Sequence, residues 1–320
     1  MSSRFKSCYG PMINRFLEYK ESLGYSRSTY EGFLADFDKY CALNYPQETV
    51  LTKELALKWG IRRKTEQQSG YRRRLSTLRE FGKFLDATSD HAYIIPSSLA
   101  GSSPQYTPYI FTDEELTKLF EAADGLEMNK QSPNRHIVLP VLLRLIYFCG
   151  LRPNEGRELK TADVDLENGI LLIRGNKTHK ERLVPMSDDM LNLCRKYADN
   201  LLYGNEYFFQ NQYGDPYSAK WLTRQFLKVW SIATADSDHH PRVRVYDLRH
   251  RFATAVMMKW IEAGIDLYSK LPYLSAYMGH SEFSATAYYI HLLPERLTKI
   301  TAVDWERFSD MIPGVFSWEL

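Results

Sequence analysis

The feature that most constrains the fold is an uncharged segment about one third of the way along the chain. Residues 95–109 contain no Asp, Glu, Lys or Arg and are rich in Ser, Pro and Gly, as is typical of a connection between domains. The chain has 320 residues, which is more than a single hydrophobic core usually supports. We therefore expect an N-terminal domain at residues 1–94, a linker at 95–109 and a second domain at 110–320.

The N-terminal part has the apolar spacing of α-helices. Between about residues 11 and 87, apolar side chains recur every three or four positions, as they do in Tyr30, Phe33, Leu34, Phe37 and Tyr40. This period predicts a small all-α bundle of about four helices.

The charge of the chain is divided unevenly. Residues 1–105 carry 16 Lys and Arg against 11 Asp and Glu, a net charge of +5, whereas the remainder carries 25 against 28, a net charge of −3. Clustered basic residues fit a surface that binds a polyanion, although a solvated helix surface explains such a cluster equally well. The excess lies in two runs, which are Arg62, Arg63 and Lys64 and then Arg72, Arg73 and Arg74.

The sequence of the second domain predicts a mainly α fold with a small β-sheet. The Thr-x-x-Glu pattern at 112–115 predicts a capping box that begins a helix, and the nearly apolar residues 138–149 predict a buried helix. Residues 170–174 and 182–186 predict two strands of a hairpin. Further helices are expected at about 188–202, 218–234, 246–264 and 284–291.

Membrane insertion, export and metal binding lack sequence signals. No apolar run approaches the roughly 20 residues that span a bilayer, and the first residues have no apolar export segment, so we expect a soluble cytoplasmic protein. The cysteines are far apart without a C-x-x-C pair, which predicts reduced thiols and neither a zinc site nor disulfides. They are Cys8, Cys41, Cys149 and Cys194. We expect no cofactor.

Two strings in the last third of the chain supply groups for phosphate chemistry. Residues 245–254 read VYDLRHRFAT, and residues 277–291 read YMGHSEFSATAYYIH. The planar fork of an arginine suits the negative charge that spreads over a pentacoordinate phosphorus. A phenol can attack that phosphorus and form a covalent protein–phosphate bond. The strings therefore supply groups that can cleave a phosphodiester if they converge on one phosphate, and nothing in them requires a metal.

The order of five strings resembles the tyrosine recombinase (phage integrase) family, which includes Xer-like recombinases. The strings are GLRPNE at 150–155, NKTHKERLVP at 176–185, DLRHRFAT at 247–254, GHS at 279–281 and YIH at 289–291. The third and fourth are highly specific, whereas the first two are weak individually. The resemblance covers roughly residues 108–295 and implies an α+β catalytic domain. The N-terminal bundle is similar to the family's core-binding (SAM-like) domain.

The resemblance implies a role for each matching residue. Arg152 and Arg249 would hold the scissile phosphate, and His280 would donate a hydrogen bond to it. Lys177 would protonate the leaving 5′ oxygen, and Tyr289 would form a 3′-phosphotyrosine. The DNA-binding surface of the N-terminal domain would consist of Arg62, Arg63, Lys64, Arg72, Arg73 and Arg74.

Two of these roles have a competing neighbour. Lys180 competes with Lys177, although the spacing from the Lys-Glu-Arg-Leu-Val-Pro string favours Lys177. Tyr288 competes with Tyr289, but neighbours on a helix point about 100° apart, so only one can face the phosphate. The offset from His280 favours Tyr289. His250 and His291 also match family positions, where we expect supporting hydrogen bonds.

Tyr246 departs from the family pattern, in which a histidine usually stands three residues before the second arginine. A phenol donates one hydrogen bond, whereas an imidazole can also carry charge or accept a proton. The substitution predicts weaker general-base help to Tyr289, and we include Tyr246 among the candidate catalytic residues.

Taken together, the resemblance implies a site-specific DNA recombinase for integration, excision or resolution, such as mobile elements use. Its partners would be double-stranded DNA with paired half-sites and, as a homotetramer, three further copies of itself; the need for an accessory protein stays open. The apolar tail at 294–320 would pack into a neighbouring protomer. The alternatives are a DNA-binding relative with weakened catalysis, for which Tyr246 is the hint, and a type IB topoisomerase.

Overall fold

The computed structural model describes residues 5–88, 92–102, 106–175, 181–200, 204–238 and 240–293. The chain divides into two compact units, Met1–Tyr106 and Thr107–Leu320. This division falls inside the uncharged segment at 95–109. Ile95 and Ala100 are nevertheless buried in the core of the first unit, so that the beginning of the segment belongs to the bundle.

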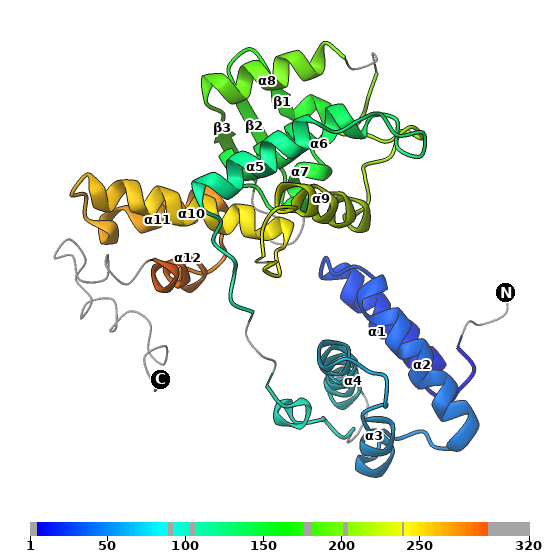
Figure 1. Cartoon of the computed structure of the whole chain (residues 1–320). Coiled ribbons are helices and arrows are strands. Elements are labelled where there is room, and N and C mark those ends of the chain that lie inside the picture. The colour runs from blue at the N-terminus through cyan, green and yellow to red at the C-terminus, as the bar shows by residue number, and fades with distance from the viewer. Residues whose placement is uncertain are drawn as a thin grey trace. The chain divides into compact units, whose positions relative to one another are not determined.

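Within residues 5–88 the first unit is an all-α bundle of four helices, as the apolar period predicts (Figure 1). The aromatic rings of Phe16, Phe37 and Phe81 meet edge to face in its core. Thr52 begins the third helix by accepting a hydrogen bond from the Leu55 amide at 3.3 Å, which is a standard N-cap. The elements are α1 Gly10–Ser22, α2 Ser28–Asn44, α3 Lys53–Trp59, α4 Gln68–Thr88 and the 3₁₀ turn η1 Ser97–Ala100.

Arg74 is part of this core. Its side chain is 1% exposed, and its Nε and Nη2 donate to the Glu66 carboxylate at 2.7 and 2.8 Å. Its Nη1 donates to the Trp59 carbonyl at 2.5 Å. All three nitrogens of this guanidinium are bonded to Glu66 or to backbone carbonyls inside the bundle, so the prediction that Arg74 binds DNA is wrong.

The second unit combines helices with a small antiparallel sheet (Figure 1). Its helices are α5 Asp113–Asp124, α6 Arg135–Phe148, α7 Pro153–Arg157, α8 Asp188–Ala198, α9 Ala219–Ala233, α10 Val245–Glu262, α11 Leu267–Met278 and α12 Ser284–Ala287. Its strands are β1 Val164–Asp165, β2 Ile170–Ile173 and β3 Arg182–Pro185, and its 3₁₀ turns are η2 Thr161–Asp163 and η3 Tyr288–Leu292. None of the described helices is long and apolar enough to cross a membrane.

The predicted hairpin and capping box are confirmed. Strand β2 pairs with β3, with Ile173 opposite Arg182, and Thr112 and Glu115 exchange both hydrogen bonds of a capping box. Strand β1 and helix α11 were not predicted. Helix α11 contains Pro272, and a proline removes one backbone donor and usually ends a helical pattern.

Helix α10 lies between two apolar clusters. Helix α6, which is mostly buried, packs against α5, α8 and α10. The first turns of α10 contribute Val245 and Leu248 to the cluster around α6. Farther along, α10 packs against α11 and η3, where Met257, Leu271, Met278 and Ile290 belong to a second buried cluster. Packing into both clusters fixes the backbone of α10, which carries the DLRHRFAT string.

The burial of Arg74 yields a stability prediction. Replacing Arg74 with alanine leaves the Glu66 carboxylate without its buried partner, which costs about 3–5 kcal/mol. Hydrogen exchange measured by mass spectrometry on the full chain should then become faster in α3 and α4. The matched variant Arg73→Ala, whose side chain is exposed, should leave this exchange unchanged. Equal protection in the two variants would contradict the structural role of Arg74.

Candidate active site

A pocket of about 340 Å³ gathers most of the predicted catalytic residues in the second unit. Its walls come from the start of α7, from α10 and from the chain between α11 and η3. The residues that line it are Arg152, Tyr246, His250, His280, Ser281, Ala285, Tyr288 and Tyr289. Groups far apart in sequence therefore meet at one place.

Arg249 is buried beside this pocket, in contact with His280. Its side chain is fully buried, and its Nη1 and Nη2 donate to the carbonyls of Gly150 and Met278 at 2.7 and 2.5 Å. Its Nε has no hydrogen-bond partner among the described residues. Burial lowers the pKa of Arg249, yet a guanidinium keeps its charge at neutral pH. Arg249 thus ties α10 to the chain beyond α6 and to the end of α11.

Glu155 holds two further arginines in place. Its carboxylate accepts hydrogen bonds from the Arg152 amide at 2.8 Å and from the Arg152 Nη1 at 2.7 Å. Arg182, the first residue of β3, donates to both of its oxygens at 3.0 and 2.7 Å. Burial alone would raise the pKa of Glu155, but the hydrogen bonds and charge of Arg182, with those of Arg152, hold it at about 2. The carboxylate is therefore ionised and positions Arg152.

The turn after α11 places His280 beside Arg249. Gly279 ends the helix with φ 65°, in the left-handed region that favours glycine, and an added Cβ would lie 2.9 Å from the Arg182 Nη1. The His280 Nε2 is 3.1 Å from the Arg249 Nη2, and its Nδ1 is 2.6 Å from the Thr286 hydroxyl. A guanidinium only donates, so Nε2 accepts and Nδ1 carries the proton.

The environment of His280 keeps its ring neutral. Burial, followed by the charges of Arg249, Arg152 and Arg182, lowers the pKa of His280 to about 3. In this tautomer Nε2 accepts a hydrogen bond, and donation from Nε2 to an anion requires that the proton lie on Nε2 instead.

Tyr289 presents its hydroxyl to the same pocket from η3. Its side chain is buried, and its hydroxyl lies 3.2 Å from the Nδ1 of His250. Burial, opposed by the charge of Arg249, raises the pKa of Tyr289 to about 12. Tyr288 also lines the pocket. Tyr246 lies one turn before His250 on α10, and the centroids of the two rings are 5.0 Å apart with the ring planes tilted by 54°.

Some predicted residues cannot be placed, and others were missed. Lys177 and its competitor Lys180 lie outside the described residues, as does the side chain of His291. The roles of Glu155 and Arg182 were not predicted, although both lie in the strings that carry the family resemblance. Among the described residues, no group of three or more His, Cys, Asp or Glu side chains is arranged to hold a metal ion.

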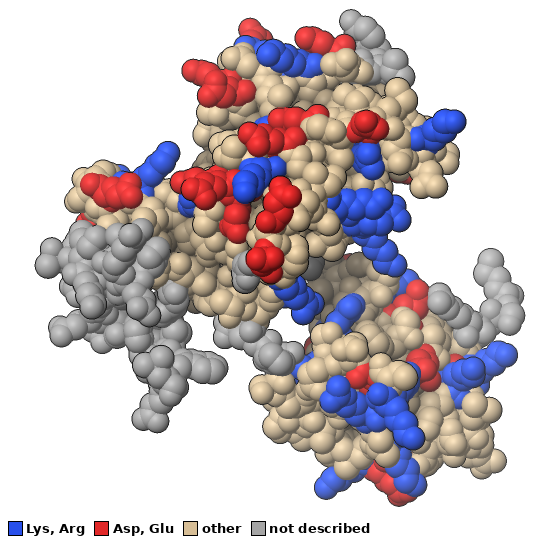
Figure 2. All heavy atoms as spheres, in the orientation of Figure 1, with Lys and Arg blue, Asp and Glu red and all other residues tan. Residues whose placement is uncertain are grey.

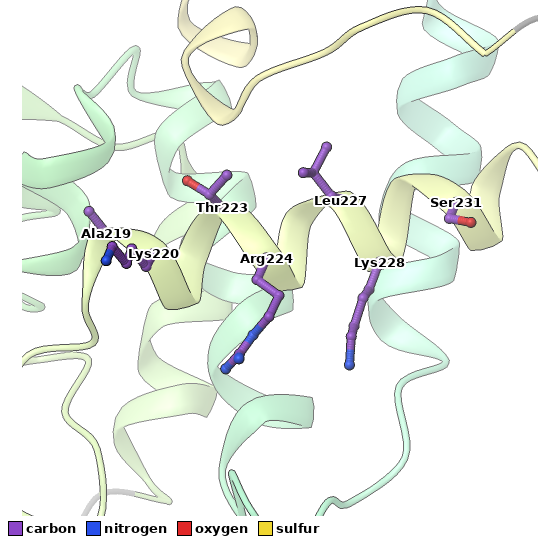
Figure 3. Close-up of a pocket in the computed structure, with 7 residues that line it drawn as sticks. All are labelled: Ala219, Lys220, Thr223, Arg224, Leu227, Lys228 and Ser231. Atoms are coloured by element: carbon purple, nitrogen blue, oxygen red, sulfur yellow. The ribbon is translucent and has the colours of Figure 1, made fainter. Parts of the chain in front are cut away.

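Basic side chains lie on both units. In the first unit the remaining predicted DNA-binding residues, Arg62, Arg63, Lys64, Arg72 and Arg73, are exposed, and Figure 2 shows Lys and Arg gathered on the visible face of this unit. In the second unit a hollow of about 640 Å³ follows the outer face of α9. It includes Lys220, Arg224 and Lys228, and the side chains of Arg224 and Lys228 extend to the same side (Figure 3).

Known proteins resemble the chain over most of its length. A model of the phage integrase family matches residues 110–296. The putative integrase/recombinase y4rB of Sinorhizobium fredii is 32% identical over 90% of this chain and 94% of its own length. Tyrosine recombinase XerC of Listeria innocua is 27% identical over 90% of this chain and 95% of its own length.

Solved structures share the fold. The XerH site-specific recombinase bound to a palindromic difH substrate, in a post-cleavage complex, aligns with a TM-score of 0.63 and 23% identity over 88% of this chain and 80% of that one. A lambda integrase dimer bound to a COC′ core site aligns with a TM-score of 0.57 and 17% identity over 87% of this chain and 76% of that one.

The fold and the matches define a class of enzymes that cleave and rejoin DNA strands at specific sites. The chain belongs to the phage integrase family and is a tyrosine-type site-specific DNA recombinase.

Glu155 yields a prediction about pH dependence. Its pKa in the folded protein, about 2, lies below its ordinary value of 4.5. The stability that its charge contributes is therefore fully present above about pH 4.5 and is lost as pH falls toward 2. Glu155→Gln should be less stable than the wild type at pH 7, by about 3 kcal/mol, and this difference should shrink at lower pH.

Urea unfolding of the full chain at several pH values measures this difference. Glu158→Gln, a change to the more exposed carboxylate that pairs with Arg157, is the matched control and should cost less. A stability difference between the wild type and Glu155→Gln that stays the same from pH 7 to pH 3 would refute the ionised state of Glu155.

Proposed function

We propose that the pocket beside α10 is the active site, and that Tyr289 attacks a DNA phosphate there. The observation that carries the proposal is the convergence of the Tyr289 hydroxyl, Arg152 and His280 on one pocket, with Arg249 bonded to His280. These groups come from separate segments of the second unit, and their chemistry matches the needs of phosphoryl transfer.

The charge of the site suits a phosphate. Three guanidinium groups surround the single carboxylate of Glu155, since Arg152 and Arg182 bond it and the Arg249 Nη1 lies 3.8 Å from it. A net positive charge remains in a region shielded from water, where it acts strongly on an anion. In our proposal Arg152 holds the phosphate oxygens, and Arg249, which is buried beside His280, contributes its positive charge from behind the pocket. His280 donates a further hydrogen bond, which requires that its proton lie on Nε2 instead of Nδ1.

The proposed reaction conserves the energy of the broken bond. The Tyr289 oxygen forms a bond to phosphorus while the bond from phosphorus to the 5′ oxygen breaks, which leaves a 3′-phosphotyrosine and a free 5′ hydroxyl. The leaving oxygen takes a proton from Lys177, with Lys180 as the alternative, because an alkoxide is a poor leaving group. Attack by the 5′ hydroxyl of a partner strand reverses these steps and rejoins the DNA.

We propose that the exposed basic residues of both units contact the DNA backbone. The set comprises Arg62, Arg63, Lys64, Arg72 and Arg73 in the first unit and Lys220, Arg224 and Lys228 on α9. Phosphate contacts of this kind orient a protein on the duplex without reading its sequence. The fold is shared with XerH and lambda integrase, whose structures contain their DNA sites, and this supports the proposal.

The assembly belongs to the same proposal. We infer a homotetramer on two paired duplexes, with residues 294–320, which lie outside the described residues, packing into a neighbouring protomer. The domain roles follow the same reasoning, with the bundle up to residue 94 binding DNA and residues 110–320 carrying catalysis. Recombination takes place where the DNA is, so we place the enzyme in the cytoplasm; an accessory protein remains an additional partner to test.

Trapping the covalent intermediate tests the nucleophile. Nicked duplexes tiled across the DNA that flanks the encoding gene are incubated with the protein, denatured and examined for protein-linked DNA. The wild type should form the adduct without added metal, and Tyr289→Phe should form none, because the attacking oxygen is missing. Tyr288→Phe is the matched control and should retain it. An adduct that survives in Tyr289→Phe and disappears in Tyr288→Phe would move the nucleophile by one residue.

The salt dependence of binding tests the basic surfaces. Each phosphate contact contributes about 0.9 to the slope of log K against log salt concentration, so that Arg72→Ala/Arg73→Ala should reduce the slope by about 2. Arg224→Ala/Lys228→Ala should do the same for α9. Fluorescence anisotropy with a labelled duplex gives the slope. Lys118→Ala, an exposed change outside both surfaces, is the control, and an unchanged slope in a double variant would exclude that surface.

A further inference from the structure

The buried hydroxyl of Tyr289 needs a base. Its side chain is 2% exposed, and burial raises its pKa to about 12. At neutral pH the phenolate is therefore rare, and attack on phosphorus requires that the proton leave as the new bond forms. Tyr246 stands where relatives usually supply an imidazole, and its phenol is a poor proton acceptor.

His250 is placed to accept this proton. Its Nδ1 lies 3.2 Å from the Tyr289 hydroxyl, which is within the reach required of a general base. The ring lines the pocket, and its position is determined by helix α10, on which it directly follows the buried Arg249. The hydroxyl of Thr254, one turn after His250, donates a hydrogen bond to the His250 carbonyl. This contact also holds the backbone at His250.

The surroundings keep His250 unprotonated until a phosphate arrives. Burial, followed by the charges of Arg249 and Arg244, lowers its pKa to about 4. The other titratable or charged groups that share the pocket are Tyr246, Tyr288, Tyr289, His280 and Arg152. A bound phosphate offsets the arginine charges and so makes the imidazole a better proton acceptor when the substrate is present.

We propose that His250 is the general base of this recombinase, a role that rests on the proposed function of Tyr289. The proton moves from the Tyr289 oxygen to Nδ1 while the oxygen–phosphorus bond forms and the bond to the 5′ oxygen breaks. The imidazole that accepts at Nδ1 carries its own proton on Nε2 and becomes an imidazolium. During rejoining the same proton returns to the phenolic oxygen, so the base is regenerated in each cycle.

The variant His250→Asn separates proton transfer from positioning. An amide side chain can still hydrogen-bond the Tyr289 hydroxyl, but it cannot take up a proton at neutral pH. Adduct formation on the tiled nicked duplexes should slow by a factor on the order of 10²–10⁴, while DNA binding stays unchanged. Added imidazole should partly restore His250→Ala. His240→Asn, a change to an exposed histidine outside the pocket, is the matched control and should react as the wild type does.

A second substrate distinguishes the base from the acid. A duplex with sulfur in place of the bridging 5′ oxygen has a leaving group that needs no proton, so it should rescue Lys177→Ala. The sulfur substrate should not rescue His250→Asn. The rate of this variant relative to the wild type should be the same on the sulfur and the oxygen substrates. Rescue of His250→Asn by the sulfur substrate, or a wild-type rate in this variant, would overturn the proposal.

Failure of the underlying function gives a different pattern. If the wild type forms no adduct on any duplex, or if Tyr289→Phe forms one, the role of Tyr289 is wrong and the role of His250 falls with it. If the wild type reacts and only Tyr289→Phe is inactive, while His250→Asn matches the wild type, the nucleophile stands and the base is overturned.

Discussion

The carboxylate of Glu155 is the contact on which the candidate site depends. It accepts hydrogen bonds from Arg152 and Arg182, and the Arg249 Nη1 lies 3.8 Å away. The positive charges of three arginines grouped around one carboxylate would repel one another strongly in a partly buried region. One buried anion allows them to coexist and joins α7 to β3. Through the arginines it also reaches the carbonyls of Tyr277 and Gly279 at the end of α11.

The same concentration of positive charge determines the protonation of the two histidines. The pKa values of His250 and His280 are lowered to about 4 and 3, because both rings are half-buried and both lie beside Arg249. Neutral rings avoid adding further charge to the cluster and keep a nitrogen free to accept a hydrogen bond or a proton. The arginines that are arranged to bind an anion thus also keep the two neighbouring imidazoles neutral.

Local signals explain which parts of the fold were predictable. The hairpin of β2 and β3 and the cap of α5 depend on neighbouring residues, so the sequence was sufficient for both. Helix α11 was missed because Pro272 interrupts the usual pattern. Arg74 was grouped with Arg72 and Arg73 because the three are consecutive. Successive helical positions point about 100° apart, so the side chain of Arg74 points into the core while its two neighbours are exposed.

In the candidate site, too, local patterns predicted some residues and tertiary contacts determined others. The sequence by itself determined the family strings and, through them, Arg152, Arg249, His280 and Tyr289 as candidates, because these lie at characteristic spacings. Lys177 stays a prediction from sequence, outside the described residues.

Only the tertiary structure decided which side chain of α10 meets the nucleophile. Tyr246 and His250 are four residues apart and therefore share one face of the helix, so spacing alone favours neither. The packing of η3 against α10 brings the Tyr289 hydroxyl to His250. That contact spans 39 residues of sequence, and no local pattern encodes a contact that arises from the burial of two separate segments against each other.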